Sequence, residues 1–372
     1  AWIPSPWSWV SRFTPCAHAS ASRKVSRLGW CSSLNIFLVV LNEKCGFTID
    51  FYIKQTEDLL VQRPVPRTSG YTNIWSNVGG MENKGWEFST TANWIESVSA
   101  RGLRWSTIVN ISQNKNKVTE LYNDEPFATG FGGRVEAGKP LGFFYGHVTD
   151  GIFQSQAEVD AHATQTVHSN PLRATSAGDI RFKDLNGDGV INDAGDRTMI
   201  GNPWPDLEGG ITNNLNFRGI DLSAFVQFSL GNDIMNAFKI YGAQYGSFGD
   251  NHTTAAMNRW TPTNTNTSEP RAVDTDPNRN TRYSDRFVED GTFWRLKNVV
   301  VGYTLPENLV GRSIRARNAR LYFQAQNLVT LTDYSGFDPE VNSLGNSSTS
   351  RGMDFYALPQ PRTLTFGVNL AY

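Results

Sequence analysis

The chain has 372 residues and a formal net charge of −1, and hydrophobic residues make up 39% of it. This length can bury a sizeable core, either in two or three ordinary domains or in one large β structure. Basic and acidic residues are interspersed and nearly equal in number, which argues against a nucleic-acid partner. The longest clearly apolar run, Ile36–Leu41, is too short for a membrane-spanning helix, whereas barrel strands alternate and form no such run.

Residues 1–45 differ in composition from the rest. All three cysteines lie here, at Cys16, Cys31 and Cys45, and the segment has no period of 2 or 3.6 residues. It also lacks the ordered regions of a signal peptide. We therefore expect residues 1–45 to be an unassigned, non-native segment that arises from a truncated or misread coding region. A small folded cap is the alternative.

From Gly46 onward, apolar and polar residues alternate with period 2, which predicts strands with one apolar and one polar face. The expected fold class is all-β, with residues 46–372 forming one unit. Eight strands are predicted: Phe47–Ile53, Trp86–Ile95, Leu103–Ser112, Ile211–Phe217, Gly219–Leu230, Phe293–Thr304, Ala319–Leu328 and Arg362–Tyr372.

Such strands fit either a soluble β-sandwich or an outer-membrane β-barrel. The predicted strands run to about 9 to 12 residues, as tilted membrane strands require, and aromatic residues stand near their ends. Short turns such as Arg218–Gly219 alternate with long loops, expected at Gln55–Lys84, Gly231–Thr292 and Thr330–Pro361. Short periplasmic turns and long extracellular loops are typical of barrels, so the barrel is favoured.

Because successive strands alternate in direction, residues 113–210 are predicted to form one long connection on the extracellular side. Within it, Gly138–Phe153 is expected to form a small hairpin. Further along lies "KDLNGDGVINDAGD" (Lys183–Asp196), which has the spacing of a calcium loop.

That loop supplies oxygen ligands at the first positions of an EF-hand but has Gly195 at position 12, where a bidentate Glu is expected. No helical period flanks the loop. We expect a structural Ca²⁺ site, and a metal-free turn held by Asx hydrogen bonds is the alternative. The candidate ligands are Asp184, Asn186, Asp188, Val190 through its carbonyl, Asn192, Asp193 and Asp196.

Four blocks of the sequence carry a family resemblance. They are "NVGGMENKGWEFS" (Asn77–Ser89), the run from "GDIRFKDLNGDG" to "FSLGNDIMN" (Gly178–Asn236), "DRFVEDGTFWRLKNVVVGYTLP" (Asp285–Pro306) and "LYFQAQNLVTLTDYSGFDPEVN" (Leu321–Asn342). In order and spacing, the chain resembles SusC/RagA-type TonB-dependent outer-membrane transporters of Bacteroidota from about residue 46 to its end.

The resemblance implies a barrel of 22 strands in the cell outer membrane, of which this chain would form the C-terminal part. It also implies a plug and a TonB-engaging segment, which we do not find in this sequence, so the chain is expected to be a fragment. A SusD-like surface lipoprotein and the TonB–ExbB–ExbD system are the expected partners. Oligosaccharides, or in some members peptides, are the expected substrates.

Aromatic residues in the long loops are weak candidates for contact with sugar rings, and packing within the loops is the alternative. They are Trp204, Tyr245, Phe248, Tyr334 and Phe337. Inward-facing polar residues, such as Asp50, Asp221 and Gln227, are expected to bond to one another or to a plug.

No catalytic motif is found. The five histidines have no metal-ligand spacing, and nucleophile-elbow and phosphate-loop motifs are lacking, so no enzymatic activity is expected. The alternative function is a secreted, calcium-dependent β-sandwich that binds carbohydrate or mediates adhesion.

Overall fold

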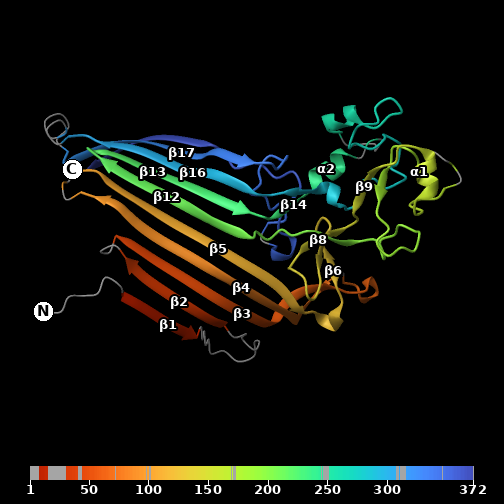
Figure 1. The fold of residues 1–372 in the computed structure, drawn as a ribbon, viewed down its shortest axis with the longest axis horizontal. Coiled ribbons are helices and arrows are strands. Elements are labelled where there is room, and N and C mark those ends of the chain that lie inside the picture. Colours follow the sequence, from red (N-terminus) through yellow and green to blue (C-terminus); the bar gives the residue numbers. More distant parts are fainter. Residues whose placement is uncertain are drawn as a thin grey trace.

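One sheet of ten antiparallel strands dominates the computed structural model (Figure 1), which describes residues 8–15, 31–40, 44–71, 73–97, 99, 102–168, 170, 173–243, 245, 251–306, 310, 316–345 and 347–371. In pairing order the strands are β1 (Ser8–Pro15), β2 (Cys31–Val40), β3 (Cys45–Pro64), β4 (Asn73–Glu96), β5 (Arg104–Glu120), β12 (Leu207–Phe217), β13 (Ile220–Leu230), β16 (Phe293–Thr304), β17 (Asn318–Thr332) and β19 (Thr363–Ala371).

The eight strands predicted from the alternation are confirmed as β3, β4, β5, β12, β13, β16, β17 and β19. β3, β4, β5, β12 and β17 are longer than predicted, and β4 reaches 24 residues. Residues 55–84 were predicted to be a loop, which is wrong. There β3 and β4 continue to pair as far as Pro64 and Asn73, and register shifts between Thr56 and Leu59 and between Leu59 and Leu60 interrupt the alternation of the sequence.

Two strands, β1 and β2, fall within residues 1–45, where the sequence showed no strand period. They extend the sheet beyond β3 in antiparallel register. The assignment of residues 1–45 as non-native stays a prediction.

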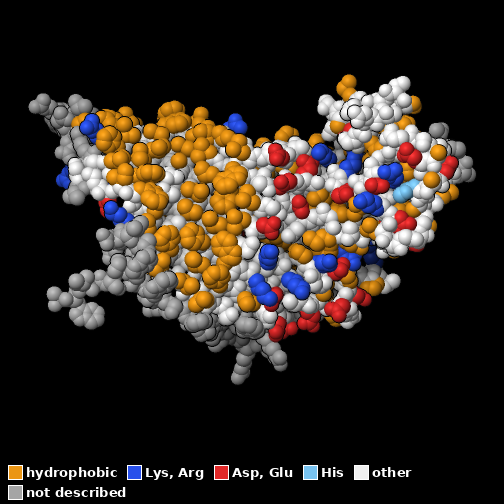
Figure 2. Space-filling view, viewed as in Figure 1, with side chains coloured by type: hydrophobic (Ala, Val, Ile, Leu, Met, Phe, Trp, Pro, Cys, Tyr) orange, Lys and Arg blue, Asp and Glu red, His pale blue; other side chains and the backbone are white. Residues whose placement is uncertain are grey.

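The two faces of the sheet differ in chemistry. Cross-strand pairing aligns Leu222, Val301, Phe323 and Phe366 in one apolar row, and Phe366 is 81% exposed. Figure 2 shows such apolar side chains as a band across the strands, while charged side chains gather toward the other end of the molecule. A water-soluble sheet would bury this face, so its exposure indicates a face directed at lipid.

The opposite face is polar, and its charged groups bond to one another as expected. Arg320 on β17 donates to Asp221 on β13, with Nε 2.8 Å from Oδ1. Asn35 donates to Asp50 on the neighbouring strand. Glycines at Gly85 and Gly367 leave room for the Tyr52 and Tyr322 side chains, which a Cβ at either glycine would meet.

Short and long connections lie at opposite ends of the sheet. The predicted two-residue turn between β12 and β13 is confirmed, and both of its residues, Arg218 and Gly219, have the positive φ that such hairpins use. The long connections gather at the other end, as Figure 1 shows. We call the described parts of residues 121–206, 231–292 and 333–362 the loop region.

The loop region has its own small sheets and buried core. One sheet contains β6 (Phe127–Thr129), β7 (Gly133–Val135), β8 (Phe143–Gly146) and β11 (Thr198–Gly201). Another pairs β9 (Thr149–Ile152) with β10 (Ile180–Phe182), and a third contains β14 (Asp233–Asn236), β15 (Val288–Asp290) and β18 (Met353–Asp354). The loop region also contains two short helices, α1 (Gln156–Ala161) and α2 (Ala237–Gly242). Its 3-10 turns are η2 (Tyr122–Asp124), η4 (Thr254–Asn258), η5 (Asp285–Phe287) and η6 (Ser348–Ser350). A further 3-10 turn, η1 (Arg67–Ser69), lies between β3 and β4.

The hairpin predicted over residues 138–153 is wrong, because β8 and β9 join different sheets. A core of Phe144, Met235, Phe287 and Met353 draws together segments far apart in the sequence. Arg295 on β16 ties the loop region to the polar face of the large sheet: it pairs with Asp338 and lies 2.9 Å from Glu340. Among the described residues, no helix is long and apolar enough to cross a membrane.

The two faces predict opposite responses to a buried charge. We expect Phe323→Arg, on the apolar face of β17, to cost about 2–4 kcal/mol, the value for an arginine facing mid-membrane lipid. Gln324→Arg, the adjacent residue on the polar face, serves as the matched control. The measurement is the amount of full-length protein in the outer-membrane fraction, which should fall severalfold only for Phe323→Arg. Equal loss for both variants would contradict the assignment of faces.

Candidate functional site

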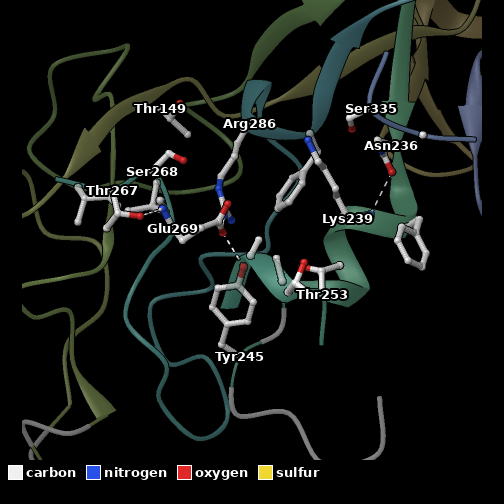
Figure 3. A pocket seen from close by; sticks show the side chains of 18 of the residues that line it. Thr149, Asn236, Lys239, Tyr245, Thr253, Thr267, Ser268, Glu269, Arg286 and Ser335 are labelled. Carbon is white, nitrogen blue, oxygen red and sulfur yellow. Dashed lines mark hydrogen bonds and ion pairs between the residues drawn. The ribbon is translucent and has the colours of Figure 1, made fainter. Parts of the chain in front are cut away.

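A cavity of about 600 Å³ opens in the loop region, between β9, α2, η5 and residues 335–337. Its lining comes from four stretches of chain: residues 149–180, 236–269, 286–287 and 335–356. The core around Phe287 and Met235 brings these stretches together. Figure 3 shows its polar side chains converging from separate loops.

One wall of the cavity carries a carboxylate shared by two donors. Glu269 accepts a hydrogen bond from the Tyr245 hydroxyl at 2.6 Å and pairs with Arg286. Burial, followed by the neighbouring Glu269, raises the pKa of Tyr245, so the phenol stays protonated as the donor. The Arg286 Nη1 atom is buried and has no partner among the described residues, which leaves one donor for a ligand.

A second polar group fixes the opposite wall. Glu289 accepts from Asn236 at 2.9 Å and from the Ser335 hydroxyl at 3.0 Å, and its ion pair with Lys239 is 2.9 Å long. Asn236 also caps α2, since its side chain accepts from the Lys239 amide. Burial acts to raise the pKa of Glu289, but the bonds from Lys239 and Ser335 outweigh it and the pKa is lowered. The carboxylate thus holds α2 against the loop at residue 335.

Aromatic side chains surround the cavity mouth. Phe337 is 75% exposed and Tyr356 is 53% exposed, and the ring of Phe238 meets Tyr356 edge to face at 5.0 Å between centroids. Exposed ring faces beside hydrogen-bonding groups can stack on a flat apolar surface while polar side chains bind hydroxyl or amide groups.

The aromatic residues predicted from the sequence fall in different environments. Phe337 lies at the cavity mouth. Tyr245 and Tyr334 are buried, and the Tyr334 hydroxyl donates to Asp354 at 2.6 Å. Trp204 lies elsewhere in the loop region, where Nε1 donates to the Leu141 carbonyl and Arg351 lies over its ring. Phe248 is outside the described residues.

Most of the polar residues that line the cavity, and Glu289, which bonds to three of them, were not predicted. Asn236, Arg286 and Glu289 lie inside or at the end of blocks that carry the family resemblance, but Lys239 and Glu269 lie outside them. No motif spacing joins these residues, because they meet only through the packing of distant loops.

The candidate calcium loop is built on turns held by its own side chains. Asp184 accepts from the Gly187 and Gly189 amides, and Asp188 accepts from the Val190 amide. These bonds lower the pKa of Asp184, beginning with the one from Gly189. Asn186 bonds to Asp188, so these three side chains lie at one end of the loop.

The side chains of the remaining candidate ligands bond to backbone amides or to His147. Asp196 is fully buried, and its carboxylate links the two ends of the loop by accepting hydrogen bonds from the amides of Leu185 and Asn192. Asn192 accepts from the amides of Ala194 and Gly195. Asp193 turns toward His147, at 3.0 Å. No cluster of three or more His, Cys, Asp or Glu side chains suited to a metal occurs within the described part of the chain.

Comparisons with known proteins agree with the fold. The chain is 36% identical over 352 residues to TonB-dependent receptor P3 of Formosa agariphila, a match that covers 91% of this chain and 33% of the relative. It is 31% identical to TonB-dependent receptor P26 of the same organism, over 92% of this chain and 34% of that relative. TonB-dependent receptor SusC of Bacteroides thetaiotaomicron is 26% identical, over 89% of this chain and 30% of the relative.

Among solved structures, the RagAB peptide transporter superposes with a TM-score of 0.74 at 21% identity, over 98% of this chain and 38% of that one. No protein-family model matches the chain. The chain spans about a third of the length of the curated relatives it matches. The predictions of family, partial-barrel fold and outer-membrane location are thus confirmed.

The lowered pKa of Glu289 predicts a pH-dependent contribution to stability. Below its usual value of 4.5 the unfolded chain takes up the proton first, so the stabilisation is complete above pH 4.5 and is lost as pH falls through the lowered folded pKa. We expect Glu289→Gln to lower the melting temperature at pH 6, through the loss of about 1–3 kcal/mol of charge-assisted bonding. The gap to the parent protein should narrow as the pH falls from 4.5 toward 3. A gap that stays constant across this range would contradict the role of the carboxylate.

Proposed function

Because this chain is homologous to about a third of the length of SusC/RagA-type TonB-dependent receptors, we propose that it forms part of the wall and external surface of an outer-membrane nutrient importer. The role is transport and not catalysis, in keeping with relatives that are named receptors. Uptake through such a barrel moves the substrate along its polar face.

The observation that carries this proposal is the division of the sheet. One face exposes an apolar row that suits lipid, and the other lines its strands with paired polar groups that suit a wet lumen. The folded connections gather at one end, where the candidate cavity opens. In barrels of this kind the long loops are extracellular, so the cavity would face incoming substrate. A sandwich needs two packed sheets, whereas the described residues form a single large one.

The partners follow from the same premise. We propose that a SusD-like surface lipoprotein covers the loop region. Coupling to the TonB–ExbB–ExbD system would run through parts of such a receptor beyond the third that this chain matches.

Oligosaccharides are the proposed substrate class. The support is the pairing of exposed rings, Phe337 and Tyr356, with polar side chains around the Arg286 donor, an arrangement that suits a sugar's apolar face and hydroxyl groups. Peptides are the second class, and a specific observation favours them: the RagAB peptide transporter superposes on this chain.

We also propose that Ca²⁺ occupies the loop at residues 184–196 as a structural ion. The Asp184, Asn186 and Asp188 oxygens and the Val190 carbonyl would hold it. Each of these oxygens retains lone-pair capacity beside the hydrogen bond it accepts. The buried Asp196 would shape the loop, and Asp193 would stay with His147.

Calcium binding is testable with a nearly isosteric change. Asp188→Asn keeps an acceptor for the Val190 amide but removes the charge. We expect calorimetry on the full chain in detergent to show a Kd of about 10⁻⁴–10⁻³ M, the range of extracellular modules, and the variant to weaken it strongly. Asp160→Asn, on α1, is the control. Absence of a binding heat in the parent protein would leave the metal-free turn as the correct account.

The uptake proposal predicts a nutrient-specific growth defect. Deleting the gene in its host should slow growth when oligosaccharide is the limiting nutrient and leave growth on the monosaccharide unchanged. Phe337→Ala with Tyr356→Ala should reduce uptake severalfold, whereas Tyr71→Ala, at an exposed ring in the β3–β4 turn, should not. A defect confined to peptide nutrients would transfer the proposal to peptides. Normal growth of the deletion strain on every nutrient would refute import.

A further inference from the structure

A second, smaller cavity in the loop region is lined by an excess of positive charge. Its volume is about 220 Å³, and its lining includes Arg197, Arg279, Arg282 and His147, with Asp193 as the one acidic side chain. Helix α2 contributes Ile240 and Tyr241 to it, and Phe238 and Lys239 to the larger cavity. The two cavities are therefore neighbours with different chemistry.

Two of the three arginines, Arg282 and Arg197, are held in place by groups other than carboxylates. Arg282 donates to the carbonyls of Asn278 and Arg279 and lies 4.4 Å over the ring of Phe182. Arg197 donates through Nε to the Asp193 carbonyl and lies over the Tyr145 ring. Among the described residues, neither forms an ion pair with a carboxylate within 4.0 Å.

The acidic side chain nearby does not neutralise this cluster. Asp193 lies 3.0 Å from His147 and 3.5 Å from Arg279, so it contacts an imidazole and a guanidinium group at once. Of the other carboxylates near Arg282, Asp196 is occupied by the amides of Leu185 and Asn192, and Asp276 by those of Asn280 and Thr281. Asp196 and Asp276 keep their negative charge and offset part of the charge of Arg282 from outside the lining. Within the lining itself, three guanidinium groups face one carboxylate, which leaves a positive excess there.

A buried donor or acceptor completes the cluster. His147 is 1% exposed, and its Nδ1 atom has no hydrogen-bond partner among the described residues. Burial lowers the pKa of His147, the bond to Asp193 opposes this, and Arg282 and Arg197 lower it again. Burial and the neighbouring Arg279 lower the pKa of Arg282 to about 10. The arginines thus act on His147 and on one another, and the unpartnered Nδ1 atom belongs to a side chain of the same lining.

We propose that this cavity binds a single oxyanion group, such as a sulfate, phosphate or carboxylate, carried on an external ligand or free in solution. Guanidinium groups match the geometry of oxyanions and bind them with charge-assisted hydrogen bonds. A volume of 220 Å³ holds one such group with an attached ring and excludes a large ligand from full entry. The site gives the loop region a means of selecting acidic ligands. In the larger cavity, by contrast, Arg286 and Lys239 are paired with Glu269 and Glu289.

The test is calorimetric titration of the full chain in detergent with sodium sulfate, sodium phosphate and a sulfated disaccharide, at constant ionic strength. Arg279→Gln is the informative variant, because Arg279 is 60% exposed and its loss should not disturb folding. We expect saturable binding in the parent protein and an affinity at least about tenfold lower in the variant, as for the loss of one charge-assisted bond. Arg181→Gln is the matched control, since Arg181 pairs with Asp150 outside this cavity.

The outcomes separate the sources of the anion. Tighter binding of the sulfated disaccharide than of inorganic sulfate supports a carried group, and equal binding supports a free ion. Absence of saturable binding, or an equal loss in both variants, would overturn the site. If Arg279→Gln unfolds, Arg197→Gln gives the same test. Because binding is measured on purified protein, failure here leaves the uptake proposal standing, and a failed growth assay leaves this site standing.

Discussion

The structure depends on one constraint: a strand that faces lipid must have every backbone amide and carbonyl paired with another strand. The ladder meets this requirement for the eight strands between its edge strands, β1 and β19, through continuous antiparallel register with bulges at a few positions, such as between Leu296 and Asn298. Once the ladder is fixed, side chains alternate between lipid and lumen, and only the residues of one parity can be polar without cost. The apolar row at Val301 and the paired charges at Asp221 follow from the same register.

The constraint ends where the strands leave the apolar band, and the chemistry changes there. Beyond it, backbone groups can be satisfied by water or by side chains, so irregular loops become possible. The loop region uses this freedom to fold around a core of its own, with Phe287 and Met235 inside. Ion pairs and hydrogen bonds then set the position of its parts: Arg295 pairs with Asp338 and Glu340, and Glu289 bonds to Lys239 of α2 and to Ser335. The two cavities are consequences of that packing.

The strands could be predicted from the sequence because period-2 alternation is local and the lipid face enforces it. The two-residue turn at Arg218–Gly219 was likewise local. The extension of β3 and β4 was missed because residues 55–84 pair outside the apolar band, where alternation is weak. The cavities could not be predicted from the sequence. Glu269 and Arg286 lie on different loops, and only the packing of these loops around a buried core brings the two side chains together. For the aromatic candidates, the residue type indicates which contacts a side chain can make but not whether it is exposed to solvent. Phe337 is exposed, whereas Tyr334 is buried.

Asp193 shows how one residue can belong to two features. By spacing it is part of the loop at residues 184–196, yet its carboxylate points to His147 and Arg279 in the small cavity. Its backbone also accepts from Arg197, which lines that cavity. The conformation of the loop therefore determines where this carboxylate stands among the arginines.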